Sequence, residues 1–354
     1  MNATSSGRKS RWKARLLLLA LAAFVSLCIV EIGLRLKGLR PLFVQPEQLQ
    51  FWAFDPSLGW KHRPGQSGPF RTRSFEVQVS INSRGLRDGE HDYARVPGKR
   101  RILVLGDSFA WGYGVEVDQR FSEVLEVELA DAEVINAGVS GYGTDQELLW
   151  LEREGARYQP DVVLLVLSGN DLPYSVESQV YFVYHKPRFR LDQSGGLIEP
   201  ELPLPPPSSW DRARLHSFRY SSTARAIDLL WDMCRRAEAA PGVQVRLAKG
   251  NEGKKLTLAL LSRLRRSSES CGARLLVLTT RIWWDNFCGN YEDFVEQLTK
   301  DGFAVFKSED APGFDPSTMI IQGDGHWNAA GHRAIALLLH EALSDSNAWT
   351  SRSP

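Results

Sequence analysis

Three polar side chains in this sequence, a serine, a histidine and an aspartate, could together activate a hydroxyl for attack on a carbonyl group. Ser108 follows a short apolar run, residues 102–105, and lies two residues after Gly106. A serine hydroxyl is a weak nucleophile at neutral pH and needs a base within hydrogen-bonding reach. His326 lies in the segment 323–328, GDGHWN, where Asp324 could orient the imidazole and stabilise its protonated form. These residue types predict a Ser-His-Asp system with Ser108 as the nucleophile.

The remaining histidines are weaker candidates for the base. His332 and His340 fall inside the predicted last helix, and none of the others has an acid-bearing motif around it; these are His62, His91, His185 and His216. Ser108 also has a second interpretation, in which residues 106–108 form an ordinary turn whose serine caps the next helix.

Alternating strand and helix patterns from residue 101 onward predict an α/β fold with a parallel sheet. Apolar runs predict strands at 101–105, from 134, and at 162–167, 274–279 and 303–306. Helical spacing predicts helices at 119–130, 144–157, 254–270, 290–300 and 329–343. Asn328 is the expected N-cap of the last helix. In such a sheet Ser108 would lie at the carboxyl edge, where open α/β sheets bind their ligands.

Four blocks occur in a fixed order: GDS at 106–108, GVSGYG at 138–143, SGND at 168–171 and GDGHWN at 323–328. In these blocks the sequence resembles the SGNH (GDSL) hydrolase superfamily, over about residues 100 to 345. The resemblance implies a flavodoxin-like three-layer sandwich with a five-stranded parallel sheet. It implies that Ser108, Gly141, Asn170 and His326 are the family's four named residues. The Ser108 N–H, the Gly141 N–H and the Asn170 side chain would then form the oxyanion hole. Asn136, Asp107 and Asp171 are assigned to loop support.

The acid departs from the commonest pattern of that family, in which it lies three residues before the histidine. Gly323 occupies that position here, and Asp324 lies two residues before His326. Gly325 would have to allow the backbone to turn between them. The run Asp324-Gly-His-Trp327 is similar to one in membrane-associated polysaccharide O-acetyltransferases.

Three functional hypotheses follow from these patterns. The first is a serine esterase or deacylase acting on an ester-bearing substrate, which could be a glycan or a lipid. The second is an O-acyltransferase that modifies a cell-envelope polysaccharide. The third is a non-catalytic glycan-binding assembly protein. An α/β-hydrolase fold is a weaker alternative, because Ala110 replaces the last glycine of G-x-S-x-G.

Composition argues against several other classes of protein. The 43 basic and 42 acidic residues nearly cancel, so no overall field indicates a nucleic-acid partner. No H-E-x-x-H, EF-hand or P-loop motif occurs, so no metal and no cofactor is expected. The four cysteines imply no disulfide framework, although Cys234, Cys271 and Cys288 could form one bridge.

The N-terminus predicts a membrane anchor. Five basic residues at 8–15 precede an apolar stretch at 16–36 that is interrupted by Glu31 and Arg35. A cleaved signal peptide would need a small-x-small site, and a buried core helix would not need the basic flank. We therefore expect a cytoplasmic segment 1–15 and an uncleaved, single-pass signal anchor in the inner (cytoplasmic) membrane. The catalytic domain would then lie on the periplasmic or extracytoplasmic side.

The rest of the chain is divided by composition. Residues 37–100 are expected to be a stem with one strand at 75–81, whose Trp52, Phe54 and Trp60 either pack on the domain or line the membrane interface. Residues 101–346 form the hydrolase-like domain, and 347–354 a tail. Within the domain, residues 172–250 read as an insertion, helical at 209–238, that is either a substrate lid or acceptor platform or a surface excursion.

Overall fold

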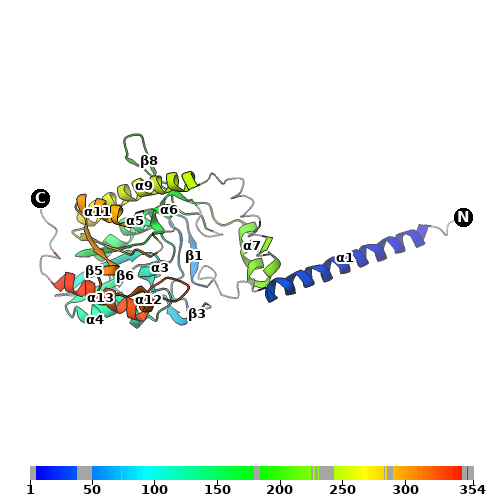
Figure 1. Cartoon of the computed structure of the whole chain (residues 1–354), viewed down its shortest axis with the longest axis horizontal. Coiled ribbons are helices and arrows are strands. Elements are labelled where there is room, and N and C mark those ends of the chain that lie inside the picture. Colours follow the sequence, from blue (N-terminus) through cyan, green and yellow to red (C-terminus); the bar gives the residue numbers. More distant parts are fainter. Residues whose placement is uncertain are drawn as a thin grey trace. The chain divides into compact units, whose positions relative to one another are not determined.

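The computed structural model describes residues 5–37, 50–72, 74–178, 184–224, 226–227, 230, 243–282, 284, 290–344 and 349. The chain forms two compact units. One contains Met1–Pro46 and Ser208–Ala240, and the other contains Glu47–Pro207 and Pro241–Pro354 (Figure 1).

The larger unit is built on a five-stranded parallel sheet, as predicted. Its strand order is β11-β10-β7-β5-β6, and every neighbouring pair is parallel. This is the flavodoxin-like order, in which the switch point lies between the first and third strands of the sheet, here β5 and β7. The strands are β5 (Arg100–Gly106), β6 (Ala132–Asn136), β7 (Val162–Leu167), β10 (Arg274–Thr279) and β11 (Ala304–Lys307).

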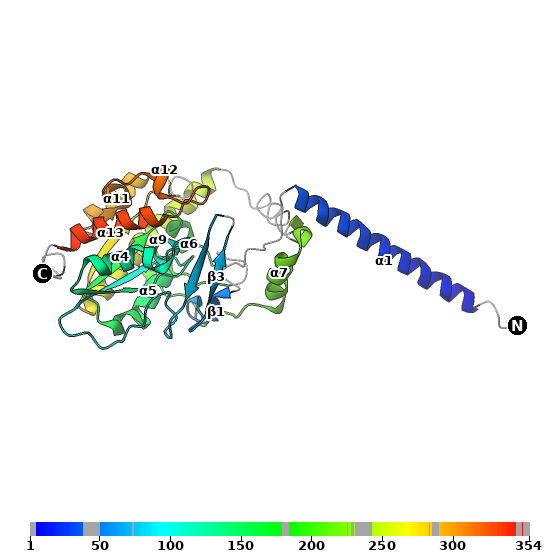
Figure 2. The same ribbon diagram turned by 90° about the horizontal axis from the view of Figure 1, so that it is seen from below.

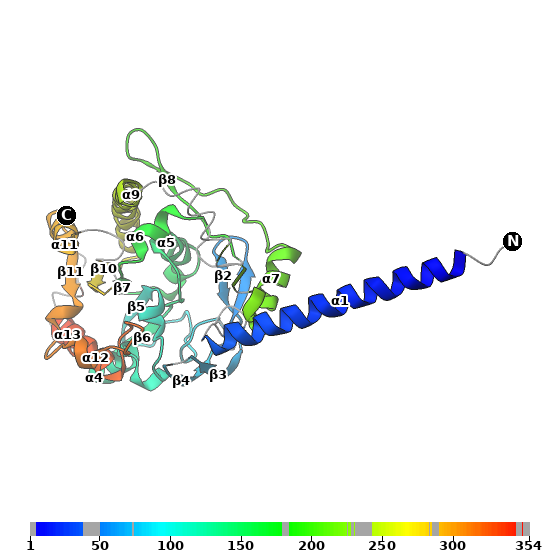
Figure 3. The ribbon, with the colours of Figure 1, turned by 45° about the vertical axis from the view of Figure 1, so that its right-hand side comes forward.

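Helices cover both faces of the sheet, so its central strands are buried along their length. Every residue of β7 is buried, which explains why its sequence is a continuous apolar run. On one face α4 (Phe121–Glu128) and α13 (Ala329–Ser344) lie side by side (Figure 2). On the other face lie α5 (Thr144–Arg153), α6 (Asp171–Val176) and α9 (Val243–Ser270) (Figure 3). The helix α11 (Tyr291–Lys300) connects β10 to β11.

The observed helices differ from the predicted ones mainly at their ends. A 3₁₀ turn, Val117–Gln119, takes the first residues of the helix expected at 119–130. The helix expected at 144–157 stops at Arg153 and is followed by a 3₁₀ turn, Gly155–Tyr158. The helix α9 begins at Val243, well before residue 254, and includes part of the predicted insertion. Asn328 caps α13 as expected, because its Oδ1 accepts from the N–H groups of Ala330 and Gly331.

The segment expected to be a stem is part of the sheet unit, which begins at Glu47. It forms two hairpins, β1 (Trp52–Asp55) with β2 (Gly59–His62) and β3 (Ser67–Arg71) with β4 (Glu76–Ser80). Of these strands only β4 was predicted. Trp52 and Trp60 are buried and stack at 5.1 Å, so they pack on the domain and do not form a membrane belt. Two-stranded hairpins are marginal alone, and these gain stability by packing on the sheet unit.

The predicted insertion is divided between the two units. The short hairpin of β8 (Arg190–Leu191) and β9 (Leu197–Ile198) belongs to the sheet unit, whereas α7 (Ser209–Tyr220) belongs to the smaller unit. The aromatic residues Tyr181 and Phe182, and most of 221–238, lie outside the described residues. So does the tail 347–354, except for Trp349, whose ring lies 3.9 Å from the Arg100 guanidinium.

The smaller unit contains the apolar N-terminal helix α1 (Ser5–Leu36). Its stretch Trp12–Leu36 is long and apolar enough to cross a membrane, by length and composition. Glu31 near its end accepts hydrogen bonds from the Ser222 and Thr223 backbone N–H groups and from the Ser221 and Thr223 hydroxyls. Its charge is also paired with Arg35 at 2.7 Å. The one acid in the apolar helix therefore has partners.

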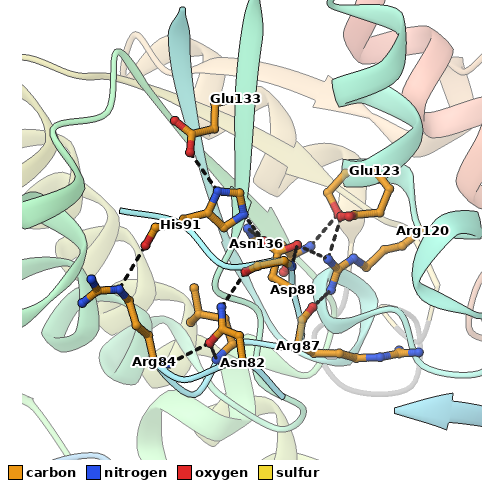
Figure 4. Close-up of polar contacts among 12 residues, drawn as sticks. Asn82, Arg84, Arg87, Asp88, His91, Arg120, Glu123, Glu133 and Asn136 are labelled. Atoms are coloured by element: carbon orange, nitrogen blue, oxygen red, sulfur yellow. Dashed lines mark hydrogen bonds and ion pairs between the residues drawn. The ribbon is translucent and has the colours of Figure 1, made fainter. Parts of the chain in front are cut away.

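Within the sheet unit, a buried ionic network joins residues 82–91 to β6 and to the start of α4 (Figure 4). His91 Nδ1 lies 2.9 Å from Glu133 on β6, and its Nε2 lies 3.2 Å from Asp88. Asp88 also pairs with Arg120 and accepts from the Asn136 backbone N–H. Burial alone would lower the pKa of His91, but the two carboxylates outweigh it and raise the pKa to about 9.

This network predicts a pH-dependent stability. Because the folded-state pKa of His91 lies above its ordinary value of 6.5, its contribution is complete below about pH 6.5 and is lost as pH rises through 9. His91→Gln should lower the free energy of unfolding at pH 6 and have a smaller effect at pH 9.5. Urea denaturation at both pH values measures this, with His340→Gln as a control. An equal loss at both pH values would contradict a charged His91.

Candidate active site

Ser108 begins the short helix α3 (Ser108–Trp111), directly after β5. The N-cap of this helix is Asp107, whose Oδ1 accepts from the Phe109 N–H at 2.9 Å. Gly106 has φ +149, and a Cβ there would lie 2.9 Å from Val166 Cβ on the neighbouring strand. Since Asp107 makes the cap, Ser108 is not needed as the capping serine, and its hydroxyl can contact another group.

The structure brings Ser108, His326 and Asp324 together. His326 Nε2 lies 2.6 Å from Ser108 Oγ, although the two residues are 218 positions apart in the chain. His326 Nδ1 is hydrogen-bonded to Asp324 Oδ1. Ser108 is 9% exposed and His326 is 7% exposed. A serine, an imidazole and a carboxylate are thus arranged in the order that activates a hydroxyl.

The loop 320–328 is folded so that an acid two residues before the histidine can reach it. Asp324 N–H and Gly325 N–H both donate to the Ile321 carbonyl, and Ile321 N–H donates to the His326 carbonyl. Gly323 and Gly325 have φ values of +76 and +103, which favour glycine. Partial burial alone would raise the pKa of Asp324, but its hydrogen bond with His326 and the charge of His326 lower it. The carboxylate is therefore held in its ionised form.

Trp327, the tryptophan of the acid-x-histidine-tryptophan run, is fully buried. Its ring packs against Phe109 at 4.8 Å and His332 at 5.6 Å. It therefore anchors the loop beneath His326 and is not available to contact an acyl acceptor.

Gly141 lies on the loop after β6, at the same edge of the sheet as Ser108. The loop crosses the turn at 106–108, which carries the candidate nucleophile Ser108 and is named the nucleophile turn, because Val139 N–H donates to the Gly106 carbonyl at 3.0 Å. Gly141 has φ +77, and its N–H group, like that of Ser108, donates to no acceptor among the described residues. Two backbone donors at this edge are thus left for a ligand.

Asn170 follows β7 and lies beside the nucleophile turn. Its Nδ2 donates to Asp107 Oδ2 at 3.0 Å, and its Oδ1 accepts from the Ser168 hydroxyl. The loop-support assignments agree with the contacts of Asn136, which donates to the Ala110 carbonyl, and of Asp171, which accepts from the Ser168 N–H. Asp107 caps α3 and also fixes the Asn170 amide.

Comparison with known proteins shows which family this chain belongs to. The sequence profile described as the GDSL-like Lipase/Acylhydrolase family matches residues 104–334, which is more than half of the chain. The chain belongs to this family. It is 35% identical over 75 residues to an arylesterase from Vibrio mimicus, a match that spans 20% of this chain and only 38% of the arylesterase.

Two solved structures illustrate how distant the structural relatives are. The esterase EstA from Pseudoalteromonas is 16% identical with a TM-score of 0.40, over 70% of this chain and 97% of EstA. A member of the lipolytic protein G-D-S-L family from Veillonella parvula is 11% identical with a TM-score of 0.38, over 69% of this chain and 98% of that one.

A buried cluster of charged side chains that the sequence did not predict lies next to the site. It consists of four acids and one lysine: Asp107, Asp145, Glu147, Asp171 and Lys186. All five side chains are buried, and only Lys186 is basic. Lys186 pairs with Asp145, whereas neither carboxylate oxygen of Glu147 has a hydrogen-bond partner among the described residues. Burial and the charges of the neighbouring aspartates raise the pKa of Glu147 well above its ordinary value. Burial therefore favours the neutral form of this carboxyl group. Within the described part of the chain, no three His, Cys, Asp or Glu side chains are arranged to hold a metal ion.

The raised pKa of Glu147 predicts the sign of a stability change. An acid whose pKa is raised on folding destabilises the folded protein as the pH rises above the ordinary pKa of that acid. For a glutamate this ordinary pKa is 4.5. Glu147→Gln should therefore raise the free energy of unfolding more at pH 8.5 than at pH 5. Urea denaturation measures the difference, and the exposed Glu128→Gln is the matched control. A loss of stability at pH 8.5 would mean that the carboxylate is ionised and paired.

Proposed function

We propose that this chain is a serine esterase or deacylase that hydrolyses ester-linked acyl groups outside the cytoplasm. The observation that carries the proposal is the 2.6 Å contact between His326 Nε2 and Ser108 Oγ, with Asp324 bound to the other ring nitrogen. The match to the GDSL-like lipase/acylhydrolase profile supports the same reaction class.

The reaction proceeds in two steps. His326 Nε2 takes the Ser108 proton as Oγ attacks the ester carbonyl carbon, and Asp324 stabilises the imidazolium. The tetrahedral intermediate collapses, the C–O bond breaks, and His326 returns the proton to the leaving alcohol. Water, activated by His326, then hydrolyses the acyl-Ser108 ester and releases the carboxylic acid.

The negative charge of the intermediate would be stabilised by three donors. These are the Ser108 N–H, the Gly141 N–H and the Asn170 side-chain amide. The first two have no acceptor among the described residues, and preorganised donors of this kind are strongest where water is excluded. Asn170 gives one N–H to Asp107 and keeps a second for the oxyanion.

The oxyanion-hole assignment predicts a specific kinetic loss. Removal of one such donor typically lowers kcat by about 10²–10³, so Asn170→Ala should lose activity of that order with a modest change in KM. The measurement is hydrolysis of acetyl and longer-chain aryl esters. Ser108→Ala gives the inactive reference, and Asn290→Ala, which removes a helix cap on α11, is the control. A loss confined to KM would make Asn170 a substrate-binding residue instead.

We further propose that residues 16–36 anchor the protein in the cytoplasmic membrane, with residues 1–15 in the cytoplasm. The five basic residues before the span support this orientation. Glu31 near the outer end is paired with Arg35 and residues 221–223, which reduces the cost of a charge in the apolar helix. The active site would then face the periplasmic or extracytoplasmic side.

This topology predicts the behaviour of reporter fusions. Alkaline phosphatase fused after the C-terminus should be active, because it folds only outside the cytoplasm, and a cytoplasmic reporter at the same place should not. Replacing the basic residues of 8–15 by glutamine should weaken this bias. A C-terminal fusion that works only in the cytoplasm would overturn the orientation without affecting the esterase assignment.

A further inference from the structure

Within the described part of the chain, two aromatic rings contact the imidazole of His326. The Tyr113 ring stacks on it, with a centroid distance of 4.4 Å and an interplanar angle of 29°. The Phe109 ring lies at 4.9 Å and is tilted by 40°. Phe109 is a core residue, whereas Tyr113 is partly exposed. Of the two rings, Tyr113 is therefore the one that is not part of the buried core.

Tyr113 is fixed to the same turn that carries the nucleophile. Gly112, with φ +82, ends α3 in the left-handed conformation, and Tyr113 N–H then donates to the Ser108 carbonyl at 3.0 Å. This hydrogen bond to the Ser108 backbone therefore fixes the position of the Tyr113 backbone, from which the ring extends. A ring placed in this way sets the imidazole plane relative to the attacking hydroxyl.

The β3–β4 hairpin also contacts the Tyr113 ring. Phe75 meets it edge to face at 5.0 Å and Phe70 at 5.5 Å. A Cβ at Gly114 would overlap with the Ile321 side chain and would lie 3.1 Å from the Phe75 ring. Ile321 is paired through its N–H with the His326 carbonyl. The hairpin, the nucleophile turn and the histidine loop thus meet at one point.

We propose that Tyr113 is a positioning residue for the general base, held in place by the β3–β4 hairpin. Its ring keeps the imidazole in the plane that reaches Ser108. The ring face also stabilises the imidazolium that forms as the proton moves, because aromatic faces attract cations. This inference rests on the proposed role of His326 and adds a function for a segment that precedes the family-matched region, residues 104–334.

Among the described residues, the titratable groups with a charge interaction with His326 lie on three elements. They are Asp324 on its own loop, Asp107 on the nucleophile turn and His332 on α13. A substitution at Tyr113 replaces none of these groups. A shift in the pH profile of a Tyr113 variant therefore reports the loss of the ring.

The test compares Tyr113→Leu with Tyr113→Phe in the full chain. Tyr113→Leu should lower kcat about tenfold, the scale of a partly desolvated cation–π contact. Its KM should change little. The acidic limb of the kcat/KM profile should move to lower pH, because the imidazolium has lost a stabilising partner. Tyr113→Phe, which keeps the ring face, should restore both. Tyr220→Leu, in the other unit, is the control.

Two outcomes would overturn the inference. One is a rise in KM with unchanged kcat and pH profile, which would make Tyr113 part of the substrate-binding surface. The other is a loss of kcat with no shift of the acidic limb, or one that phenylalanine fails to rescue. Phe75→Leu keeps the Tyr113 side chain but removes a ring that supports it. This variant should shift the acidic limb in the same direction to a smaller extent. If Ser108→Ala is as active as the wild type, the proposed function has failed and not the stacking alone.

Discussion

The contact between Ser108 Oγ and His326 Nε2 is the constraint on which the rest of this structure depends. It joins residues that are 218 positions apart, so a rigid scaffold must supply the alignment. The parallel sheet provides it, because the carboxyl ends of β5, β6 and β7 meet at one edge. Ser108, Gly141 and Asn170 each follow one of these strands, and the buried Trp327 anchors the loop that brings His326 to them.

The polar groups beneath the nucleophile turn extend this alignment. Asp107 caps α3 with one carboxylate oxygen and receives the Asn170 amide with the other. Burial raises the pKa values of four acids at this edge, Asp107, Asp145, Glu147 and Asp171. Within the cluster only Lys186 carries a positive charge that opposes this effect. Buried polar groups cost stability unless they are paired. This destabilising burial occurs at the edge of the sheet where Ser108 and His326 lie, and perturbed pKa values commonly cluster at functional sites.

Much of this arrangement could be predicted from the sequence, and the exceptions have a physical cause. The strand 162–167 was evident because a strand buried on both faces must be apolar throughout. Asp324 could be paired with His326 because both lie in one short glycine-containing loop. The strands β1–β3 and the Tyr113 contact could not be predicted, because tertiary packing and not local periodicity decides where their aromatic rings lie. Glu147 resembled an ordinary polar residue of an amphipathic helix, and its burial follows from tertiary packing that the local sequence does not specify.

The most direct test of the account is where the enzyme becomes covalently modified. Incubation of the full chain with a fluorophosphonate, followed by intact-mass measurement and peptide mapping, should find one adduct, on Ser108. Asp324→Asn should slow that labelling by orders of magnitude while leaving the fold intact, because the imidazole loses its orientation and its charge partner. Ester turnover by a chain that shows no adduct on Ser108, or an adduct on another residue, would contradict the account.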